Sequence, residues 1–373
     1  MRVLYLVPQS PFPPRSGPTI RNFGLLRGLT AAGHTVTTVT FAETRPIPGY
    51  SPAEIVRALE PYGGVELVPI APRTRWRRLL ELRLPEPDLV RRLVSPALVG
   101  TCRQLLARQR FDLVHIGGLE MAPSALAIDR RGAALVLDDH NAEYLLQRRN
   151  CLNELRLGGN PVGLVYSALQ WKKLEAYERM VCRAADAVVA VSEPDAAALR
   201  ALAPGIEPIV VPNPIDVHEY QPSATPTVNH PPVLLFTGTM DYRPNIDAVV
   251  WLCYQVLPRL RAELPGVRVR IVGQRPAPAV RRLGELPGVE VVGPVPDDRP
   301  YLREADLYVV PMRVGGGIRL KILQAMASGV PVVATSLAYE GIAATPGVHL
   351  AVGDTPAEFA RQVVALVQSP ERR

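Results

Sequence analysis

The stretch at 306–335 constrains the fold more than any other part of the chain. Its segments at 307–310 and 330–334 are short and almost wholly apolar, as strands buried on both faces of a parallel sheet are. Between them lie three consecutive glycines at 315–317, followed by a helix expected at 319–328. A strand, a glycine turn, a helix and a second strand make one βαβ unit, so the stretch predicts a parallel α/β sheet.

The glycine turn and the helix start also predict an anion site. Glycines let the backbone approach a ligand closely, and a helix N-terminus offers unpaired N–H groups and the positive end of a dipole. Arg319 and Lys321 add two cations at a helix end that normally favours acidic residues. On spacing alone, an ordinary tight turn explains the glycines equally well. The stretch has no GxxxxGK[ST] loop, and it is not a GxGxxG turn after a first strand.

The segment GGGIRLKILQAMASGVPVVAT at 315–335 resembles the donor-binding segment of glycosyltransferase family 4, whose members are retaining enzymes of the two-domain GT-B fold. It is most similar to a subgroup that carries GGGxRLKxLEAMA. The resemblance implies that Arg319 and Lys321 bind the donor diphosphate and act in catalysis, and that Gln324 replaces a glutamate that contacts the ribose. It implies further donor contacts for Gly315, Gly316, Gly317 and Ile318. We expect no cofactor and no metal, because the two cations would neutralise the diphosphate.

The rest of the chain alternates expected strands with helical stretches. The strands are expected at 2–7, 36–41, 65–70, 113–116, 134–137, 187–191, 233–236, 267–273 and 289–292. The clearest helices are expected at 19–32, 164–183 and 356–368. Such alternation predicts doubly wound parallel sheets. The fold class is therefore α/β, and the resemblance implies a GT-B protein with two Rossmann-like domains that face each other across a cleft.

The motif order sets the expected domains. They are an N-terminal acceptor-binding domain at 1–212, a linker rich in Pro, Ser, Thr and Asn at 213–232, and a C-terminal nucleotide-sugar-binding domain at 233–373. Typical family members continue past the helix expected at 356–368 with a helix that crosses back onto the first domain. Residues 369–373 are too few to form it, so we expect that helix to be missing here.

Two motifs in the first domain predict site residues. DDHNAEY at 138–144 follows an expected strand, and ligands of doubly wound sheets bind beyond the carboxyl ends of the strands. Either His140 or Glu143 contacts a sugar there, or Asp138 or Asp139 merely caps a turn. The family often has a histidine at this strand end, which makes His140 a catalytic candidate by resemblance. The loop at 8–18 resembles the family's opening, which implies that Gly17 lies against the donor phosphate or the acceptor.

The second domain carries further donor contacts by resemblance. Its opening, GTMDYRPN at 238–245, is similar to the subgroup's G-x-M-x-x-x-P-N, which implies contacts from Gly238 and Arg243. The segments around Gly273 and Val295 resemble those that line the nucleotide base pocket in the family. Turns at the edge of the sheet are an alternative explanation for the segment that contains Val295.

Composition excludes several classes of protein. Hydrophobic residues make up 47% of the chain and charged residues 21%, which is typical of a globular protein. We expect no membrane-spanning helix and no signal peptide, and the four cysteines are spaced too widely for a zinc site. These features favour a cytoplasmic protein.

An arginine-rich segment at 73–110 stands out within a net charge of +7. It contains ten arginines and three acidic residues. A solvated helical surface explains it, or else contact with an anionic membrane at the inner face of the cell or with a lipid-linked acceptor. Nucleic acid is not expected as a partner, because the segment matches no nucleic-acid-binding module.

The leading hypothesis is a retaining glycosyltransferase that moves a hexose-type sugar from a nucleoside diphosphate to a sugar or lipid-linked acceptor, in cell-surface glycan or glycolipid synthesis. Two alternatives remain: another GT-B enzyme of nucleotide sugars, such as an epimerase, and a catalytically weak nucleotide-sugar-binding subunit. A dehydrogenase is disfavoured because prolines stand where a GxGxxG turn would follow the first strand.

Overall fold

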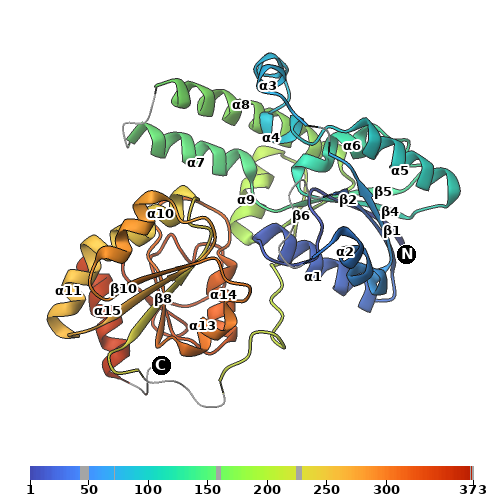
Figure 1. The fold of residues 1–373 in the computed structure, drawn as a ribbon. Coiled ribbons are helices and arrows are strands. Elements are labelled where there is room, and N and C mark those ends of the chain that lie inside the picture. Colours follow the sequence, from blue (N-terminus) through green and yellow to red (C-terminus); the bar gives the residue numbers. More distant parts are fainter. Residues whose placement is uncertain (43–49, 71, 157–160, 224–228, 370, 372–373) are drawn as a thin grey trace. The chain divides into compact units, whose positions relative to one another are not determined.

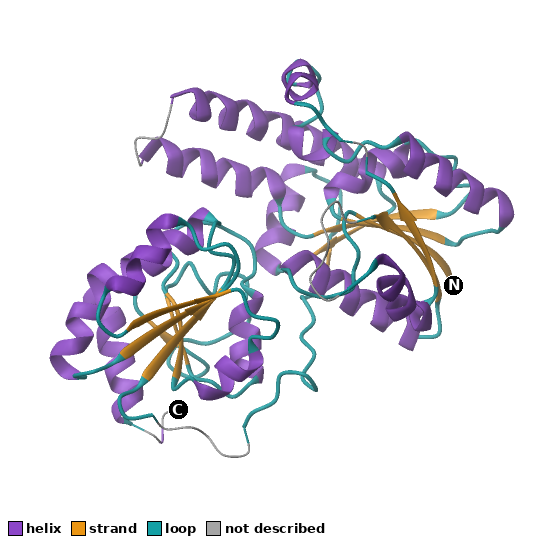
Figure 2. Ribbon diagram, in the orientation of Figure 1, coloured by secondary structure: helices purple, strands orange, loops and turns teal. Residues whose placement is uncertain are grey.

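The computed structural model describes residues 1–42, 50–70, 72–156, 161–223, 229–369 and 371. The chain forms two compact units, residues 1–214 and 215–373. Their division lies close to the domain end expected at residue 212. Each unit is a parallel β-sheet covered by helices (Figures 1 and 2). The expectation of two doubly wound α/β domains is therefore confirmed.

The first unit contains a seven-stranded sheet in the order β3-β2-β1-β4-β5-β6-β7, in which every pair is parallel. Its described strands are β1 (Arg2–Val7), β2 (Thr35–Phe41), β3 (Gly64–Val68), β4 (Leu113–Gly117), β5 (Ala134–Asp139), β6 (Ala187–Ala190) and β7 (Ile209–Val210). Its described helices are α1 (Gly17–Ala31), α2 (Pro52–Leu59), α3 (Arg75–Glu81), α4 (Asp88–Arg91), α5 (Pro96–Arg108), α6 (Ala122–Leu126), α7 (Glu143–Arg156), α8 (Pro161–Ala184) and α9 (Glu193–Leu202). Strand order reverses between β1 and β4, which leaves a crevice beyond their carboxyl ends.

The second unit contains a six-stranded parallel sheet in the order β10-β9-β8-β11-β12-β13. Its described strands are β8 (Val233–Thr237), β9 (Arg268–Val272), β10 (Val289–Gly293), β11 (Leu307–Val310), β12 (Val332–Ala334) and β13 (Ala351–Val352). Its described helices are α10 (Arg243–Trp251), α11 (Leu257–Glu263), α12 (Pro278–Arg281), α13 (Arg299–Glu304), α14 (Leu320–Ala327) and α15 (Pro356–Gln368). A π-helical turn at Leu252–Val256 joins α10 to α11. The reversal of strand order falls between β8 and β11.

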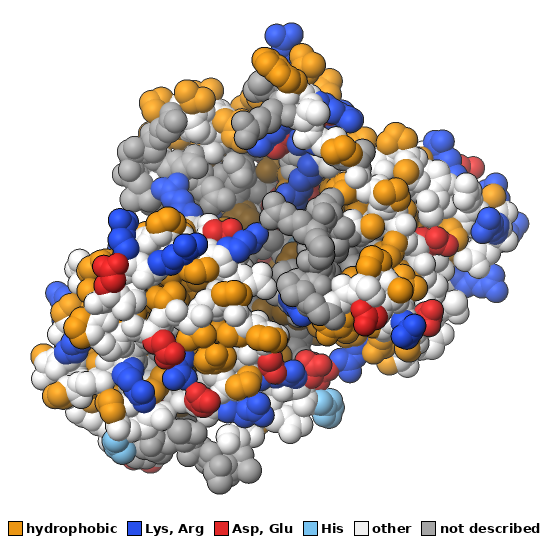
Figure 3. Space-filling model, viewed as in Figure 1, with side chains coloured by type: hydrophobic (Ala, Val, Ile, Leu, Met, Phe, Trp, Pro, Cys, Tyr) orange, Lys and Arg blue, Asp and Glu red, His pale blue; other side chains and the backbone are white. Residues whose placement is uncertain are grey.

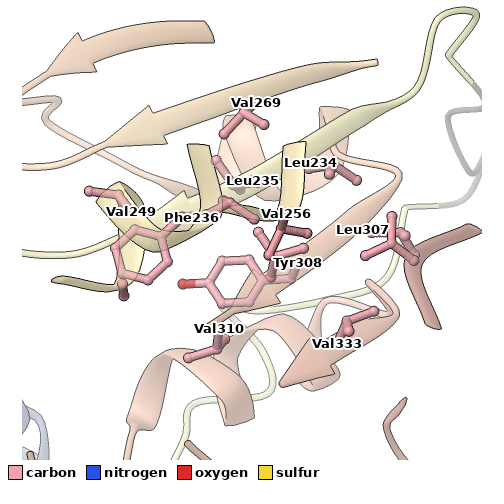
Figure 4. Close-up of a cluster of buried hydrophobic side chains, with 14 of the residues drawn as sticks. Leu234, Leu235, Phe236, Val249, Val256, Val269, Leu307, Tyr308, Val310 and Val333 are labelled. Carbon is pink, nitrogen blue, oxygen red and sulfur yellow. The ribbon is translucent and has the colours of Figure 1, made fainter. Parts of the chain in front are cut away.

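The apolar runs of the sequence become the central strands. Every residue of β8 and β11 is buried, and Figure 4 shows side chains from both strands packed with Val249 of α10. The one polar atom that Tyr308 carries into this core is satisfied, since its hydroxyl lies 2.6 Å from Thr237 Oγ1. Continuous apolar runs are what a strand covered by helices requires, and this is why the pattern predicted these strands.

One expectation about β5 was wrong. Asp138 and Asp139 were expected to follow the strand, where either could cap a turn, but β5 continues through both of them and both are buried. Asp138 accepts hydrogen bonds from Arg21 of α1, with Arg21 Nε 2.9 Å from Asp138 Oδ2. Burial of a carboxylate is tolerated here because a buried guanidinium pairs with it.

Arg21 joins three parts of the first unit. Besides Asp138, its guanidinium donates to the carbonyl oxygen of Val211 at 2.9 Å and to Asn213 Oδ1 at 3.0 Å. Burial alone would raise the pKa of Asp138, but the neighbouring His115, His140 and Arg21 outweigh burial and hold this pKa well below its usual range. The ion pair therefore links α1, β5 and the end of the unit at residues 211–213.

We predict that Asp138→Asn lowers the free energy of unfolding by about 3–5 kcal/mol at neutral pH, because it leaves the buried charge of Arg21 without a counter-charge. The contribution of Asp138 is present above its unfolded pKa and is lost as the pH falls through the lowered folded pKa, so the difference shrinks in strong acid. Urea unfolding measures both effects. The control is Glu207→Gln, which breaks the exposed pair with Arg200 and should cost under about 1 kcal/mol. Equal effects of the two substitutions would contradict the prediction.

Candidate functional site

The glycine turn of the second unit lies between β11 and α14. Gly315 has a φ of 105° and Gly317 a φ of 78°, values that residues with side chains rarely adopt. Gly316 and Ile318 are half-buried. Arg319 is the N-cap of α14, so the helix begins one residue later than expected. The turn therefore needs glycine at two positions, and it places a cation directly at the helix start.

Lys321 lies at the point where the strand order of this unit reverses. Its Nζ donates to the carbonyl oxygen of Thr237, the last residue of β8, at 2.7 Å, and to Asn245 Oδ1 at 3.1 Å. The same nitrogen lies 4.1 Å from the centre of the Phe236 ring. No carboxylate forms an ion pair with Lys321 among the described residues. Burial first, and then the charge of Arg319, lower the pKa of Lys321 to about 7.

Two glycines make room for this ammonium group. A Cβ at Gly238 would lie 2.9 Å from Lys321 Nζ and 2.8 Å from the amide nitrogen of Asn245. A Cβ at Gly273 would collide with the carbonyl oxygen of Gly238, because β8 and β9 approach each other closely at their carboxyl ends. The absence of a side chain at Gly238 leaves room for the lysine, and its absence at Gly273 leaves room for the backbone of Gly238. Both positions have a structural reason to be glycine in addition to any contact with a ligand.

Arg319 is the second cation of this site. Its side chain is buried, and its Nη1 donates to the carbonyl oxygen of Gly317 at 2.5 Å. The guanidinium therefore stays beside the turn from which it comes. Arg319 is also close enough to Lys321 to contribute to the lowered pKa of the lysine. Two cations close together at the start of a helix can bind an anion.

Gln324 has a partner that sequence analysis missed. Its Nε2 donates to the hydroxyl of Tyr220 at 2.7 Å. Tyr220 lies in the stretch that was expected to be a linker, 104 residues before Gln324. Burial, and then the charge of Asp298, raise the pKa of Tyr220 above its usual value, so the hydroxyl keeps its proton. The amide of Gln324 is thus oriented by a side chain that no local motif would suggest.

The remaining expected donor residues are more scattered. Arg243 is exposed as the first residue of α10, a helix that was expected to begin near Ile246. Val295 is half-buried against the core of the second unit. Gly17 is the exposed first residue of α1 in the first unit, where Ser16 caps the helix and its N–H donates to Thr19 Oγ1 at 2.9 Å. The structure brings together Gly238, Lys321 and Arg319 of the expected set.

The first unit has a pocket of about 340 Å³ at the corresponding reversal of strand order. Its wall includes the loops that follow β1, β4 and β5. The residues that give it polar side chains are Gln9, Arg92, Glu120, Asp139, His140, Asn141 and Glu143. His140 and Glu143 thus lie where the sequence motif predicted a site, and ligands of such sheets bind in this position.

Three of the seven polar side chains in this pocket wall are acidic. Arg92 is already paired with Glu120 at 2.9 Å. Burial first, and then the charge of Glu120, raise the pKa of Glu143 to about 8, and Asn141 Nδ2 donates to its carboxyl group at 3.2 Å. His140 Nε2 lies 3.6 Å from Asp138 Oδ2. A carboxyl group that keeps its proton near neutral pH can donate as well as accept hydrogen bonds, as binding of hydroxyl groups requires.

Glu178 of α8 supports this wall, and sequence analysis missed it. Its buried carboxyl group accepts from the backbone N–H groups of Glu143 at 2.8 Å and of Tyr144 at 2.7 Å, and so caps the start of α7. Burial raises the pKa of Glu178 to about 7, and burial together with the charge of Glu178 raises that of the neighbouring Asp139. Such a pair is stable when it holds a proton between its two members.

Several arginines of the arginine-rich segment at 73–110 form ion pairs within the unit. Glu81, although buried, accepts from Arg73 at 2.7 Å, from Arg77 at 3.0 Å and from Arg91 at 3.2 Å. Asp88 pairs with Arg73 and with Arg78. Several of these arginines therefore hold α3 and α4 in place, a role that counting charges could not reveal.

Among the residues that the structure describes, no group of three or more histidine, cysteine, aspartate or glutamate side chains is arranged to hold a metal ion. Among the same residues, no helix is both long enough and apolar enough to cross a membrane.

We predict that Lys321→Met stabilises the ligand-free protein. The lysine has a folded pKa of about 7 and an ordinary value of 10.5, so the unfolded state binds more protons between these values. The cost of burying the charge is therefore fully present below about pH 7 and disappears as the pH rises towards 10.5. At about pH 6.5 the gain in the free energy of unfolding should be about 1–3 kcal/mol, since the lost hydrogen bonds offset part of it.

Urea unfolding at several pH values measures this gain. The matched control is Lys172→Met, because Lys172 lies exposed on α8 and its loss should change stability by under about 0.5 kcal/mol. If Lys321→Met instead lowers the free energy of unfolding at about pH 6.5, the folded protein stabilises the ammonium group of Lys321 and the prediction is wrong.

Comparison with solved structures identifies the fold. The chain superimposes over its whole length on sucrose-phosphate synthase from Thermosynechococcus elongatus, with a TM-score of 0.72, 17% identity and 91% of that chain covered. It also matches HepE from Anabaena, solved in complex with UDP and glucose, over 100% of this chain and 91% of that chain, with a TM-score of 0.66 and 16% identity. Together with the two parallel sheets, these likenesses show the GT-B fold.

Comparison with curated proteins gives shorter matches. The chain is 31% identical over 166 residues to a phosphatidyl-myo-inositol mannosyltransferase from Propionibacterium freudenreichii subsp. shermanii, which covers 43% of this chain and 40% of that protein. It is 32% identical over 141 residues to the protein of the same name from Mycolicibacterium smegmatis, which covers 36% of this chain and 35% of that protein. These matches span two-fifths or less of the relatives' own length.

Comparison with protein families covers both units. A family model described as "Glycosyl transferases group 1" matches residues 231–369. A second, described as "Glycosyltransferase Family 4", matches residues 16–219, which is more than half of the chain. The chain belongs to glycosyltransferase family 4.

Proposed function

We propose that this protein is a retaining glycosyltransferase that transfers a hexose-type sugar from a nucleoside diphosphate to an acceptor. The observation that carries the proposal is the pair of cations at the start of α14: Arg319 donates to the glycine turn, and Lys321 donates to neutral oxygens at the carboxyl end of β8. A diphosphate is the anion that a site with two cations and a helix N-terminus suits best.

In this reaction the bond between the anomeric carbon and the diphosphate oxygen breaks, and its electron pair stays on the diphosphate. The negative charge that grows there is stabilised by Arg319, by Lys321 and by the N–H groups of the glycine turn. The acceptor hydroxyl forms the new bond to the anomeric carbon on the face from which the diphosphate leaves, and its proton passes to the departing diphosphate oxygen. No metal is needed in this scheme, because the cations neutralise the leaving group, and the nucleotide sugar is a co-substrate and not a cofactor.

The acceptor binds, in this proposal, in the pocket of the first unit, where His140 contacts the sugar. The protonated carboxyl group of Glu143 and the amide of Asn141 suit hydroxyl groups. HepE was solved with UDP and glucose, and two relatives are named as mannosyltransferases of a phosphatidylinositol. These names support a nucleotide-sugar donor and a glycan or lipid-linked acceptor.

Substitution of either cation tests the catalytic role. Arg319→Ala or Lys321→Ala should lower kcat by a factor of about ten to a thousand, because each removes a charge that stabilises the leaving group. Initial rates with the preferred donor measure this effect, and Lys172→Ala on the exposed face of α8 is the control. A wild-type kcat in either site variant would contradict the diphosphate role.

Donor binding should take up a proton above neutral pH. The diphosphate stabilises the charged form of Lys321, so its pKa rises from about 7 when the anion binds. Calorimetry with uridine, guanosine and adenosine diphosphates at about pH 8, in buffers of different ionisation enthalpy, measures the uptake and identifies the base. Lys321→Met should abolish the uptake, and proton uptake that persists in this variant would place the titrating group elsewhere.

The second candidate function, a weak nucleotide-sugar-binding subunit, is favoured by Gln324, which stands where the family has a charged ribose contact.

Another GT-B enzyme of nucleotide sugars, such as an epimerase, would use the same donor site. Unlike a glycosyltransferase, such an enzyme converts the nucleotide sugar in the absence of an acceptor. Product analysis with and without candidate acceptors separates these activities.

The substitution Gln324→Glu tests whether glutamine at this position weakens nucleotide binding at the donor site. A carboxylate accepts stronger hydrogen bonds from ribose hydroxyls than an amide does, and the hydroxyl of Tyr220 can donate to it. We therefore predict that the dissociation constant of the preferred nucleoside diphosphate falls by a factor that corresponds to about 1 kcal/mol, with the fold intact. Weaker binding in the variant would show that the site is adapted to the amide.

A further inference from the structure

The short helix α3 exposes two large apolar side chains on one of its faces. Trp76 is 78% exposed and Leu80, one turn further along the helix, is 66% exposed. The beginning of α8 shows the same feature, since Val162 is 76% exposed and Val165 is 70% exposed. Figure 3 shows hydrophobic side chains at this end of the first unit, with cationic side chains around them. Side chains of this size rarely gather at a surface without a partner.

The opposite face of α3 holds the helix in place. Arg78 lies about half a turn from Trp76, and its Nη2 donates to the hydroxyl of Tyr166 on α8 at 2.9 Å. Beyond the end of α3, Lys173 Nζ of α8 donates to the carbonyl oxygen of Leu82 at 2.6 Å. Because the inward contacts are made by Arg78 and by residue 82, Trp76 and Leu80 point away from α8. The apolar face of α3 is thus fixed in an outward orientation, and Figure 1 shows the helix projecting from the unit.

The charge around α3 is positive. Four arginines at 73, 77, 78 and 91 share only the two carboxylates of Glu81 and Asp88, which leaves a local charge of +2. Arg77 and Arg78 are half-exposed, and Arg83 is exposed at the end of the helix. A helix with Trp and Leu on one face and arginines at its flanks has the composition of a segment that lies in the interface of an anionic bilayer.

We propose that the outward face of α3, centred on Trp76 and Leu80, docks onto an anionic lipid bilayer, with Val162 and Val165 as a second apolar contact. A protein partner fits less well, because specific protein interfaces bury about 20–30 residues a side and a single projecting helix offers far fewer. A bilayer needs only a few inserted side chains together with nearby cations. The aromatic ring of Trp76 suits the level of the head groups.

This surface is connected to the pocket of the first unit. Ile70, just before the arginine-rich segment, and Arg92 and Leu93, just after α4, all line that pocket. Docking of α3 would therefore bring a bilayer to the unit that contains this pocket, through a segment that begins and ends at the pocket wall. This step rests on the proposed function, and it identifies the acceptor class as the hydroxyl-bearing head group of a membrane lipid.

Flotation of the full chain with lipid vesicles tests the docking. The vesicles are phosphatidylcholine alone, or phosphatidylcholine with about one third phosphatidylglycerol. The wild type should float with the anionic vesicles, and the emission of Trp76 should shift to shorter wavelength. Trp76→Ser/Leu80→Ser should reduce the partition coefficient at least about tenfold, because the inserted apolar groups are gone. The control, Val348→Ser, removes a side chain that is 75% exposed in the second unit, and it should bind as the wild type does.

Three results would overturn the proposal. They are wild-type protein that does not float, a double variant that floats as well as the wild type, and self-association of the wild type that the double substitution abolishes in sedimentation velocity. The last would mean that a second copy of the chain covers α3. Calorimetry with nucleoside diphosphates keeps the two proposals apart, since a double variant that binds nucleotide normally but not vesicles fails only in docking. A wild type that floats but binds no nucleotide would refute the proposed function and leave the docking intact.

Discussion

The positive charge of Lys321 is the constraint on which the candidate site of the second unit depends. Its ammonium group has a carbonyl oxygen, an amide oxygen and an aromatic face as partners, and these partners leave its pKa near 7. The glycines at 238 and 273 have no room for a side chain, because the strand ends close around that group. An apolar residue would fill the same space at lower cost, and this is why we propose an anion that restores the charge of the lysine.

Arg21 of the first unit shows what a purely structural cation looks like. It is buried, and its donors reach a carboxylate, a carbonyl oxygen and an amide oxygen within the same unit. Nothing further is needed to stabilise its charge, and it holds α1 to β5. The two cations therefore differ in whether the protein itself supplies a counter-charge. This difference, and not burial alone, separates a residue that supports the fold from one that is arranged for a ligand.

Features that depend on neighbouring residues could be predicted from the sequence. Apolar runs predicted β8 and β11, and α15 has the bounds expected from the sequence; Glu358 N–H donates to Thr355 Oγ1 at 3.2 Å at its start. Contacts between distant polar groups could not be predicted. Nothing local pairs Tyr220 with Gln324, or Arg21 with Asp138 across 117 residues. Periodicity reports which face of an element is buried, but it does not report which polar groups meet there.

Charge also separates the two candidate ligand sites. In the first unit, burial raises the pKa of Glu143 to about 8 and that of Glu178 to about 7, so these carboxyl groups tend to be uncharged near neutral pH. Any that do ionise would repel a phosphate, and Arg92 of the described pocket wall is already paired with Glu120. The pocket therefore suits hydroxyl groups, whereas the cations of the second unit suit an anion. Under the proposed function, the donor diphosphate and the acceptor hydroxyl groups are thus distinguished by charge as well as by shape.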